Sequence, residues 1–309
     1  MKFSIIIPAY KIQFINEAIL SVINQSYNEF ELLIFDDCSP ENIFSVVSQY
    51  LNDERVKYFQ NNHPYGAEAL SQNWNNALQY CQGNYVICMG DDDCMLPNCL
   101  EEYSILIKKY PNTNVFHAQT EIIDENSSVI EYLSPRFEHE NVWQFIYYRW
   151  AGCGRQQFIG DFCYKRDFLI KNGGFYNLPL AWGSDDITAC IIANNGGIAN
   201  SQKICFQYRK NSYSISNSGN NRLKVRALYL QREWYKKFLA NAKVKTEEEK
   251  KFFVLLKRLF VVHFDFYIKE NIRYDIKNKK SRVFYWLLNK SQSKLTTSQI
   301  FIQFLKSYI

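Results

Sequence analysis

Residues 85–93 read YVICMGDDD and decide the fold, because a short apolar run of strand length leads directly into a glycine and three aspartates. A helix signal follows at Leu96-Pro97-Asn98. Three adjacent carboxylates repel one another, so this turn favours a cation. Mg²⁺ or Mn²⁺ is commonly held by one or two carboxylates together with substrate phosphates. The alternative interpretation is an acidic turn without a metal, in which Asp92 or Asp93 caps the following helix.

Upstream of this turn, short apolar runs alternate with helix-like segments. Strands separated by helices of this length predict parallel βαβ units and therefore an α/β fold. Ligands of such sheets bind at the carboxyl ends of the strands, so residues 8–10, 36–37 and 91–93 should meet in one crevice. The expected strands are 3–7, 31–35, 56–59 and 85–89, and the expected helices are 14–25, 41–51, 67–81 and 97–109.

The pattern changes after residue 110. Two apolar runs flank the polar residues DENS at 124–127, which predicts a β-hairpin. We expect one domain over residues 1–221, made of a nucleotide-binding half (1–110) and an acceptor half (111–221), and a helical region over 222–309. The remaining expected elements are a helix at 140–150, a strand at 158–164, a turn at 173–174, a helix at 185–194 and a strand at 203–208.

Charge is divided unevenly along the 309 residues. Residues 1–221 hold 15 Lys and Arg against 24 Asp and Glu, whereas residues 222–309 hold 21 against 7. The basic region with its interleaved aromatic residues therefore suggests a partner of its own. Nucleic acid is not the expected partner, because the rest of the chain is acidic and shows no recognition motif.

Cysteine usage and the apolar runs bear on the compartment. The nine cysteines are odd in number and show no CxxC spacing, which favours reduced thiols in a cytoplasmic protein. No apolar run reaches the roughly 18 residues of a membrane span, and the first run is too short for a signal peptide. We therefore expect a cytoplasmic protein.

Four sequence elements together resemble the family 2 glycosyltransferases with the GT-A fold, over roughly residues 1–215. The resemblance implies a mostly parallel central sheet with helices on both faces, to which this chain adds its C-terminal helical region. It also implies transfer of a sugar from a nucleotide diphosphate donor. The four elements are PAYK at 8–11, LIFDDCS at 33–39, GDDD at 90–93, and GGF at 173–175 followed by AWGSDD at 181–186.

The resemblance carries nucleotide-binding roles to several residues. In the family one carboxylate of the Asp-Asp pair accepts a hydrogen bond from the base, and we favour Asp37 over Asp36. Helix capping by either residue, or by Ser39, is the alternative. Asn73 lies where many relatives carry an Ala-Arg-Asn element, which is Asn-Trp-Asn here, so a diphosphate-binding arginine is lost. The other candidates are Pro8, Ala9, Tyr10 and Asp91.

The GDDD turn occupies the place of the family's DxD metal motif. The resemblance implies a Mn²⁺ or Mg²⁺ cofactor with Asp92 as the first ligand and Asp93 as the second candidate. Asp91 would face the ribose or the metal. The missing arginine would leave more of the leaving-group charge to that ion.

The last element implies the general base and an acceptor contact. The family's aspartate base is carried over to Asp185, with Asp186 as the second candidate, because an inverting transfer needs one carboxylate at the acceptor hydroxyl. A helix N-cap by Ser184 or Asp185 is the competing interpretation, and both can hold at once. Trp182 could stack on a sugar or belong to the core. Residues 208–210 and 214–216 resemble the closing strand and the loop over the donor.

The sequence therefore predicts an inverting, metal-dependent glycosyltransferase of the hexosyl- or N-acetylhexosaminyl-transferring class. The resemblance favours a UDP-sugar as donor and leaves dTDP-, GDP- and CDP-sugars open. The acceptor would be a glycan or lipid-linked glycan of cell-surface polysaccharide biosynthesis. The alternatives are an inactive glycan-binding or scaffold protein and a sugar-nucleotide nucleotidyltransferase. For residues 222–309 we expect peripheral contact with the inner face of the plasma membrane, against a solvated helical subdomain or a dimer contact.

Overall fold

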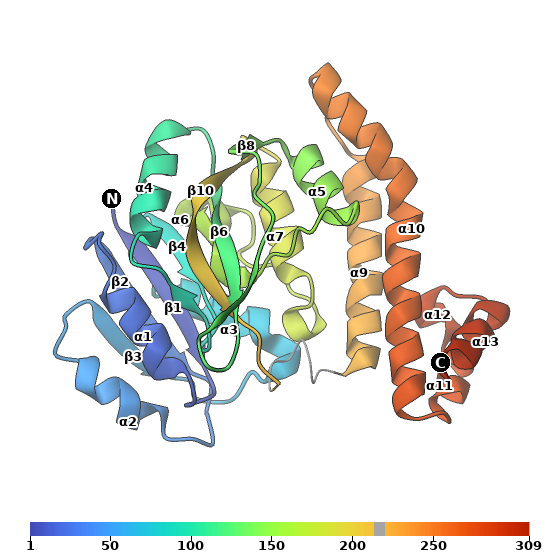
Figure 1. Ribbon diagram of the computed structural model, residues 1–309, viewed down its shortest axis with the longest axis horizontal. Coiled ribbons are helices and arrows are strands. Elements are labelled where there is room, and N and C mark those ends of the chain that lie inside the picture. The colour runs from blue at the N-terminus through green and yellow to red at the C-terminus, as the bar shows by residue number, and fades with distance from the viewer. Residues whose placement is uncertain (213–219, 309) are drawn as a thin grey trace. The chain divides into compact units, whose positions relative to one another are not determined.

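The computed structural model describes residues 1–212 and 220–308. The chain forms two compact units: the first is Met1–Asn177 with Ser184–Asn211, and the second is Leu178–Gly183 with Ser212–Ile309. Figure 1 traces the chain through both. The division at residues 110 and 221 stays a prediction.

Four parallel strands form the N-terminal half of the sheet in the first unit. They are β1 (Phe3–Ala9), β2 (Phe30–Asp36), β3 (Val56–Gln60) and β4 (Tyr85–Cys88), in the spatial order β3-β2-β1-β4. β1 and β2 are buried almost throughout, as expected of parallel strands covered on both faces. The register sets Ala9 opposite Asp36, so the polar residues that end these two strands lie at the same edge. The predicted parallel arrangement is confirmed.

The second half of the sheet is mixed. Next to β4 follow β9 (Phe162–Lys165), β6 (Val115–Ile123), β10 (Ile198–Arg209) and β5 (Cys94–Met95), and β9 is antiparallel to both of its neighbours. β7 (Val129–Tyr132) pairs with β6 as the predicted hairpin, and β8 (His139–Glu140) pairs with β10. Figure 1 shows β6 and β10 side by side in the centre of this half.

The helices of the first half are shorter than predicted. α1 (Ile15–Ile23) buries residues at helical spacing, Ile15, Ala18, Ile19 and Val22 among them. The expected helix at 41–51 is α2 (Ile43–Val47) followed by the 3₁₀ turn η1 (Ser48–Tyr50), and the one at 67–81 is η2 (Ala67–Ala69) followed by α3 (Leu70–Leu78). α4 is Cys99–Lys109.

Two expectations for the second half need correction. The strand predicted at 158–164 begins only at Phe162, because residues 159–161 form the 3₁₀ turn η3 (Ile159–Asp161). A side chain at Gly160 would collide with the ring of Phe206 on β10, so the glycine lets this turn pack tightly. The last strand is twice the predicted length. The helices here are α5 (Val142–Trp150), α6 (Arg166–Lys171) and α7 (Ser184–Ala193).

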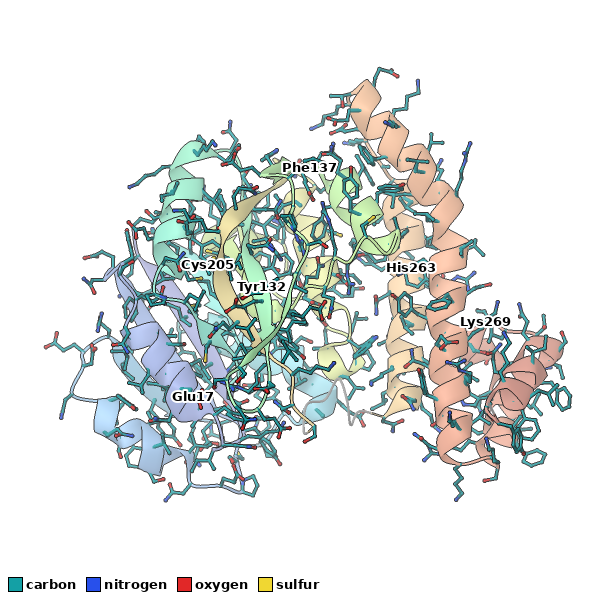
Figure 2. The ribbon with its side chains drawn as sticks, viewed as in Figure 1. Glu17, Tyr132, Phe137, Cys205, His263 and Lys269 are labelled. Carbon is teal, nitrogen blue, oxygen red and sulfur yellow. The ribbon has the colours of Figure 1, made fainter. Side chains whose placement is uncertain are left out.

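The second unit is helical in its described residues. It contains the 3₁₀ turn η4 (Pro179–Ala181) and the helices α9 (Asn221–Ala240), α10 (Glu247–Asn278), α11 (Arg282–Leu288), α12 (Lys290–Ser293) and α13 (Thr297–Lys306). α9 and α10 pack along each other, and α13 packs on α10 and α11. Lys269 of α10, labelled in Figure 2, pairs with Asp265 at 3.7 Å. No helix in the described part of the chain is long and apolar enough to cross a membrane.

All nine cysteines are free thiols, in agreement with the expectation of reduced cysteines. Cys205, labelled in Figure 2, is fully buried on β10. Burial raises the pKa of thiols such as Cys88 and Cys163 well above the usual value, so these thiols are packing residues rather than nucleophiles.

Candidate active site

Asp91 joins the acidic turn to the carboxyl end of β1. Its Oδ2 accepts hydrogen bonds from the backbone N–H groups of Tyr10 and Lys11, both at 2.8 Å. The Oγ of Ser39, which follows β2, donates to the carbonyl of Tyr10 at 2.6 Å. The ends of β1, β2 and β4 therefore meet, as the parallel sheet predicted.

Asp92 and Asp93 turn toward the end of β10. Asp92 Oδ2 accepts from the side chain of Asn211 at 2.6 Å, and Asp93 Oδ1 accepts from the backbone N–H of Arg209 at 3.0 Å. The interpretation of this turn as a helix cap is wrong, because the residue before α4 is Asn98 and no side chain caps that helix. A Cβ at Gly90 would lie 2.7 Å from Asp92 Oδ1, so a side chain at this position would displace the Asp92 carboxylate.

Burial makes these carboxylates costly to ionise. It raises the pKa of Asp91, with a further contribution from the Asp92 charge, to about 6. Burial also raises the pKa of Asp92, and burial together with the Asp92 charge raises that of Asp93 well above its usual range. A divalent cation would relieve this repulsion, and oxygen donors are the ligands that Mg²⁺ and Mn²⁺ prefer. The donor set therefore fits such an ion.

Of the three aspartates, Asp93 is the least accessible, with 3% of its surface exposed. Asp91 and Asp92 are half-buried. The described residues contain no group of three or more His, Cys, Asp and Glu side chains arranged as a metal site. An ion held by one or two carboxylates completes its shell with water and phosphate oxygens, so Asp92 with Asp91 would suffice.

Asp37 is buried and holds the segment that follows β3. Its Oδ1 accepts from the side chain of Asn61 and the backbone N–H of Tyr65, both at 2.9 Å, and its Oδ2 accepts from the backbone N–H of Gly66 at 3.0 Å. A carboxylate has about four acceptor positions, so one position remains on Oδ2. The carboxylate thus fixes the loop whatever else it binds.

Capping of α2 by the Asp-Asp pair or by Ser39 is not observed. Asn42 caps this helix, with its side chain accepting from the backbone N–H of Ser45 at 3.2 Å. Asp36 instead accepts from the backbone N–H of Ser39 at 2.8 Å and from the hydroxyl of Tyr58 at 2.7 Å. Asp36 and Asp37 therefore accept hydrogen bonds from the loops at this edge of the sheet and do not cap α2.

Asn73 lies on the buried face of α3. Its side chain accepts from Asn61 at 3.0 Å, the same residue that donates to Asp37. The neighbouring Trp74 packs edge-on against Phe175 with ring centres 5.8 Å apart. Asn73 thus supports the loop that Asp37 holds, and its contact with a nucleotide stays a prediction.

The pair Asp185 and Asp186 occupies the first turn of α7. Asp186 Oδ1 accepts from Arg149 Nε at 3.2 Å and from the side chain of Gln157, so a partly exposed guanidinium orients this carboxylate. Burial, with the Asp186 charge as the next cause, raises the pKa of Asp185 to about 8. Asp185 therefore binds a proton more tightly than an ordinary aspartate does.

The predicted cap of α7 by Ser184 is not found. The Ser184 Oγ is buried and makes no hydrogen bond within the described residues, and the same holds for the hydroxyl of Tyr164. Asp185 is the charge that acts most strongly on Tyr164, although burial is the main reason that the pKa of Tyr164 is raised. Two buried hydroxyl groups, one next to Asp185 in sequence and one that is affected by its charge, therefore have no hydrogen-bond partner within the described residues.

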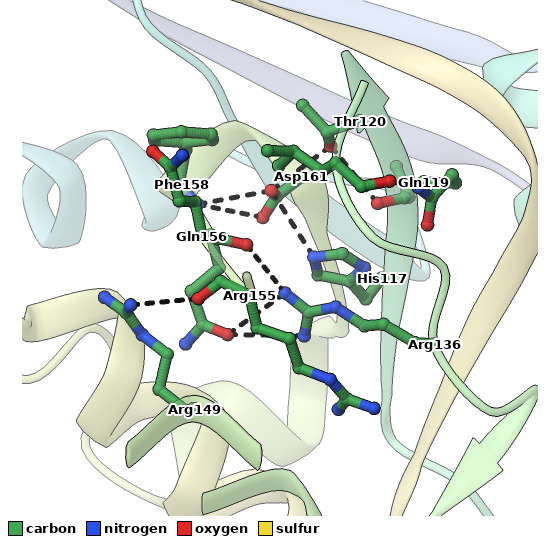
Figure 3. A network of polar contacts seen from close by, with 12 residues as sticks. His117, Gln119, Thr120, Arg136, Arg149, Arg155, Gln156, Phe158 and Asp161 are labelled. Carbon is green, nitrogen blue, oxygen red and sulfur yellow. Dashed lines mark hydrogen bonds and ion pairs between the residues drawn. The ribbon is translucent and has the colours of Figure 1, made fainter. Parts of the chain in front are cut away.

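Asp161 is a buried acid that the sequence did not reveal. It accepts from the backbone N–H of Phe158 and from Thr120 Oγ1, and its Oδ2 lies 3.4 Å from His117 Nε2 (Figure 3). Burial raises its pKa to about 7. Its charge repels both Asp93 and Asp185, so it lies within electrostatic reach of both acidic clusters. An aspartate in an irregular turn gives no sequence signal for such a position.

Two arginines border the same network. Arg136 donates to the carbonyl of Gln156 at 2.9 Å and to the side chain of Gln157 at 3.3 Å (Figure 3). Arg149 donates to the carbonyl of Arg155 at 3.0 Å. Gln157 thereby links Arg136 to Asp186, and this support of the acid pair was also missed in the sequence.

Trp182, the predicted acceptor platform, belongs to the second unit. Lys224 Nζ lies 4.6 Å from the centre of the Trp182 ring. The backbone carbonyl of Trp182 accepts a hydrogen bond from the side chain of Gln231 at 2.7 Å. The ring is half-buried. Its contact with a sugar stays a prediction, and so does that of residues 208–210 with the donor. Residues 214–216 lie outside the described part of the chain.

The strand order, the mixed sheet and the acids at the carboxyl ends of the strands define a nucleotide-sugar transferase of the GT-A type. Residues 4–173 match the model of the family described as glycosyl transferase family 2. The chain belongs to this family, and it is therefore a glycosyltransferase. The predictions of the fold and of the enzyme class are confirmed.

Two bacterial relatives show which activities occur among similar sequences. The chain is 30% identical over 237 residues to the Escherichia coli protein named UDP-Glc:alpha-D-GlcNAc-diphosphoundecaprenol beta-1,3-glucosyltransferase WfgD, covering 75% of this chain and 83% of that one. It is 36% identical over 102 residues to the Campylobacter jejuni GalNAc(5)-diNAcBac-PP-undecaprenol beta-1,3-glucosyltransferase, covering 32% of each. Both relatives are named for lipid-linked acceptors.

The fold is shared with a solved structure. Residues 1–349 of S. aureus TarS, in complex with UDP-GlcNAc, superpose with a TM-score of 0.66 at 19% identity, over 100% of this chain and 89% of that one. At this identity the likeness concerns the fold alone. It extends over the C-terminal helices as well as the sheet.

Proposed function

We propose that this glycosyltransferase is inverting and metal-dependent, and that it moves a hexose or N-acetylhexosamine from a UDP-sugar to a hydroxyl of a lipid-linked glycan. The observation that carries the proposal is the acidic turn itself, in which Asp91 meets the end of β1 and Asp92 meets Asn211 just beyond the end of β10. The relative named for UDP-Glc and a diphosphoundecaprenol acceptor supports the donor and the acceptor class. Cell-surface polysaccharide biosynthesis is the setting that follows.

The donor would lie along the carboxyl ends of β1, β2 and β4. Asp37 has one acceptor position for the N–H of a uracil. Residues 8–10, Asn73 and Asp91 would also contact the nucleotide. Asp92, with Asp91 beside it and Asp93 as the more buried candidate, would hold Mn²⁺ or Mg²⁺. A bound ion there supplies charge stabilisation for the departing diphosphate.

The acid pair on α7 would supply the general base. Inversion requires one carboxylate to take the proton of the acceptor hydroxyl on the side opposite the leaving group. Asp185 is the first candidate, since its raised pKa makes it the stronger base. Asp186 is the second, because Arg149 pairs with it and orients it. Trp182 would contact the acceptor sugar.

We include membrane contact of residues 222–309 in the proposal, since a lipid-linked acceptor is presented at a membrane surface. The protein would then be cytoplasmic and peripheral on the inner face of the plasma membrane.

Calorimetric titration of UDP, dTDP, GDP and CDP, each with and without Mn²⁺, tests the proposal. We expect UDP to bind, and Asp92→Asn to remove the part of the affinity that depends on Mn²⁺. Asp53→Asn is the matched control, because Asp53 pairs at the surface with Arg55 at 2.6 Å in the same unit. If no nucleotide binds, an inactive glycan-binding protein explains the chain better. A sugar-nucleotide nucleotidyltransferase is disfavoured by the family match.

A further inference from the structure

We infer that α11 and α13 form one surface that binds an anionic lipid membrane. This inference deepens the membrane contact in the proposed function, because it identifies the face and the lipid charge. We call this surface the outer apolar face. It consists of the exposed side chains Phe284, Leu288, Phe301, Ile302, Leu305 and Tyr308.

The spacing of these residues sets them on one side of each helix. Phe284 and Leu288 are four residues apart on α11, and Leu288 has 86% of its surface exposed. On α13, Phe301, Leu305 and Tyr308 follow at intervals of four and three, the last just beyond the helix. Residues at these intervals face the same way on a helix.

Both helices also have an inner apolar side. Trp286 of α11 and Ile300 of α13 are completely buried, and α13 packs on α10 and α11. A helix that carries large apolar side chains on its outer side as well as its inner side is not matched to water on the outer side. An interfacial position, with apolar side chains among the lipid headgroups and acyl chains, satisfies that side.

The charge of this region selects the lipid. Residues 276–309 contain no Asp or Glu and seven basic residues, namely Lys277, Lys279, Lys280, Arg282, Lys290, Lys294 and Lys306. The preceding acid, Asp275, is buried and accepts from Arg282 at 2.7 Å and from the indole of Trp286 at 3.0 Å. The surface therefore presents positive charge alone, which complements anionic lipid.

The basic and apolar groups lie together. Lys280 Nζ lies 4.0 Å from the centre of the Tyr308 ring and donates to the hydroxyl of Ser307 at 2.9 Å. Lys290 Nζ donates to Thr297 Oγ1 at 3.0 Å, between α12 and the start of α13. Lysines beside aromatic rings suit a headgroup layer, where the ring is buried and the ammonium meets phosphate.

α10 provides an internal comparison. It also exposes apolar side chains, including Val262 and Phe266, which are four residues apart. Residues 247–275 of this helix, however, carry six basic and six acidic residues, so this stretch has no net charge. Equal apolar exposure without the charge makes α10 the matched control for the outer apolar face.

Vesicle co-sedimentation of the full chain tests the inference. The probes are vesicles of phosphatidylglycerol and phosphatidylcholine in equal parts, and vesicles of phosphatidylcholine alone. We expect binding to the anionic vesicles only. Phe301→Glu with Leu305→Glu should weaken it about a hundredfold or more. The control, Val262→Glu with Phe266→Glu, should change vesicle binding by less than about fivefold, since its new charges are on α10 and not among the residues of the outer apolar face.

Three results would overturn the inference: no binding of the unchanged protein to anionic vesicles, equal binding to phosphatidylcholine alone, or equal losses in the two double variants. A dimer in solution that Phe301→Glu with Leu305→Glu dissociates, without vesicle binding, would assign the face to a second copy instead. Melting curves by circular dichroism establish that both variants fold. Turnover with a detergent-dispersed acceptor should stay unchanged, which separates this inference from the proposed transfer reaction.

Discussion

The two units use charge in opposite ways. In the first unit, acidic side chains are buried at the carboxyl ends of strands and held by backbone amides, as Asp91 is by Tyr10 and Lys11. In the second unit, the basic side chains of residues 276–309 lie at the end of α10, on the short helices and in the turns between them, with one buried acid, Asp275, beside them. The comparison teaches that the first unit gathers its charges at one edge of a sheet, whereas the end of the second unit spreads its charges over several helices and turns.

The largest expected effect concerns the acid pair of the first unit. If one member is the general base, its replacement by Asn should lower kcat about a thousandfold, the usual scale of general base catalysis, while UDP affinity stays unchanged. Asp185→Asn and Asp186→Asn are compared by single-turnover rates and calorimetry. Retained turnover in both variants would remove the base from this pair.

Arg209 tests how strongly the first unit depends on its buried charges. Its fully buried guanidinium donates to the carbonyls of Asp92 at 2.8 Å and Asp124 at 3.0 Å, and pairs with Glu17 at 2.8 Å. Figure 2 labels Glu17. Arg209→Met should reduce the free energy of unfolding by about 3 kcal/mol, because buried acceptors lose their donor.

The matched substitution in the second unit is Arg232→Met. Arg232 pairs with Asp265 at 3.1 Å, and both side chains are partly exposed. This change should cost no more than about 1 kcal/mol in urea denaturation, because a solvated pair contributes little. Equal costs at the two positions would contradict the contrast between the units.

Asp275 is the exception within the second unit, since it is buried. Asp275→Asn keeps the shape but removes the charge that Arg282 and Trp286 meet, so we expect a loss of about 2 kcal/mol in the free energy of unfolding. Glu247→Gln is the control, because Glu247 pairs with Lys250 at 3.6 Å on the surface. A loss no larger than that of the control would show that Asp275 does not fix α11.

Sequence pattern was sufficient for the sheet and insufficient for the contacts of the acids. Periodicity and chain order predicted the parallel strands and the meeting of Asp91 with the end of β1, because apolar runs of strand length are a local property. The alternative interpretations of Asp92 and Ser184 as helix caps are wrong, since side chains distant in sequence decide where these polar side chains turn. Asn211, which donates to Asp92, is 119 residues away along the chain.

Asp161 shows the same limit more sharply. Its position depends on a 3₁₀ turn that a strand prediction overlooked, and on Gly160 fitting against β10. Nothing in a short polar stretch distinguishes a buried acid from a surface one. The contribution of Arg149 and Gln157 to the acid pair was hidden for the same reason, because their contacts span 37 and 29 residues.

The pH dependence of turnover separates the two candidate bases by a smaller effect. The pKa of Asp185 is raised to about 8 by burial and by Asp186. If Asp185 is the base, it must be ionised to act, so kcat/KM should rise about tenfold per pH unit below 8 and level off above it. If Asp186 is the base, ionisation of Asp185 is not required for turnover, and no such rise near pH 8 is expected.

The stability of the folded protein should also depend on the ionisation of Asp185, and it should fall over the pH range in which turnover rises. Because the folded-state pKa of Asp185 exceeds that of an unfolded aspartate, the folded protein binds the proton more tightly, and its stabilising contribution is lost as pH rises through about 8. Asp185→Asn removes this loss, so the melting temperature of the variant relative to the unchanged protein should increase from pH 5 to pH 9. A melting-temperature difference that does not change with pH would mean that Asp185 ionises at its ordinary pKa. The general base would then be assigned to the residue, Asp185 or Asp186, whose replacement by Asn abolishes turnover.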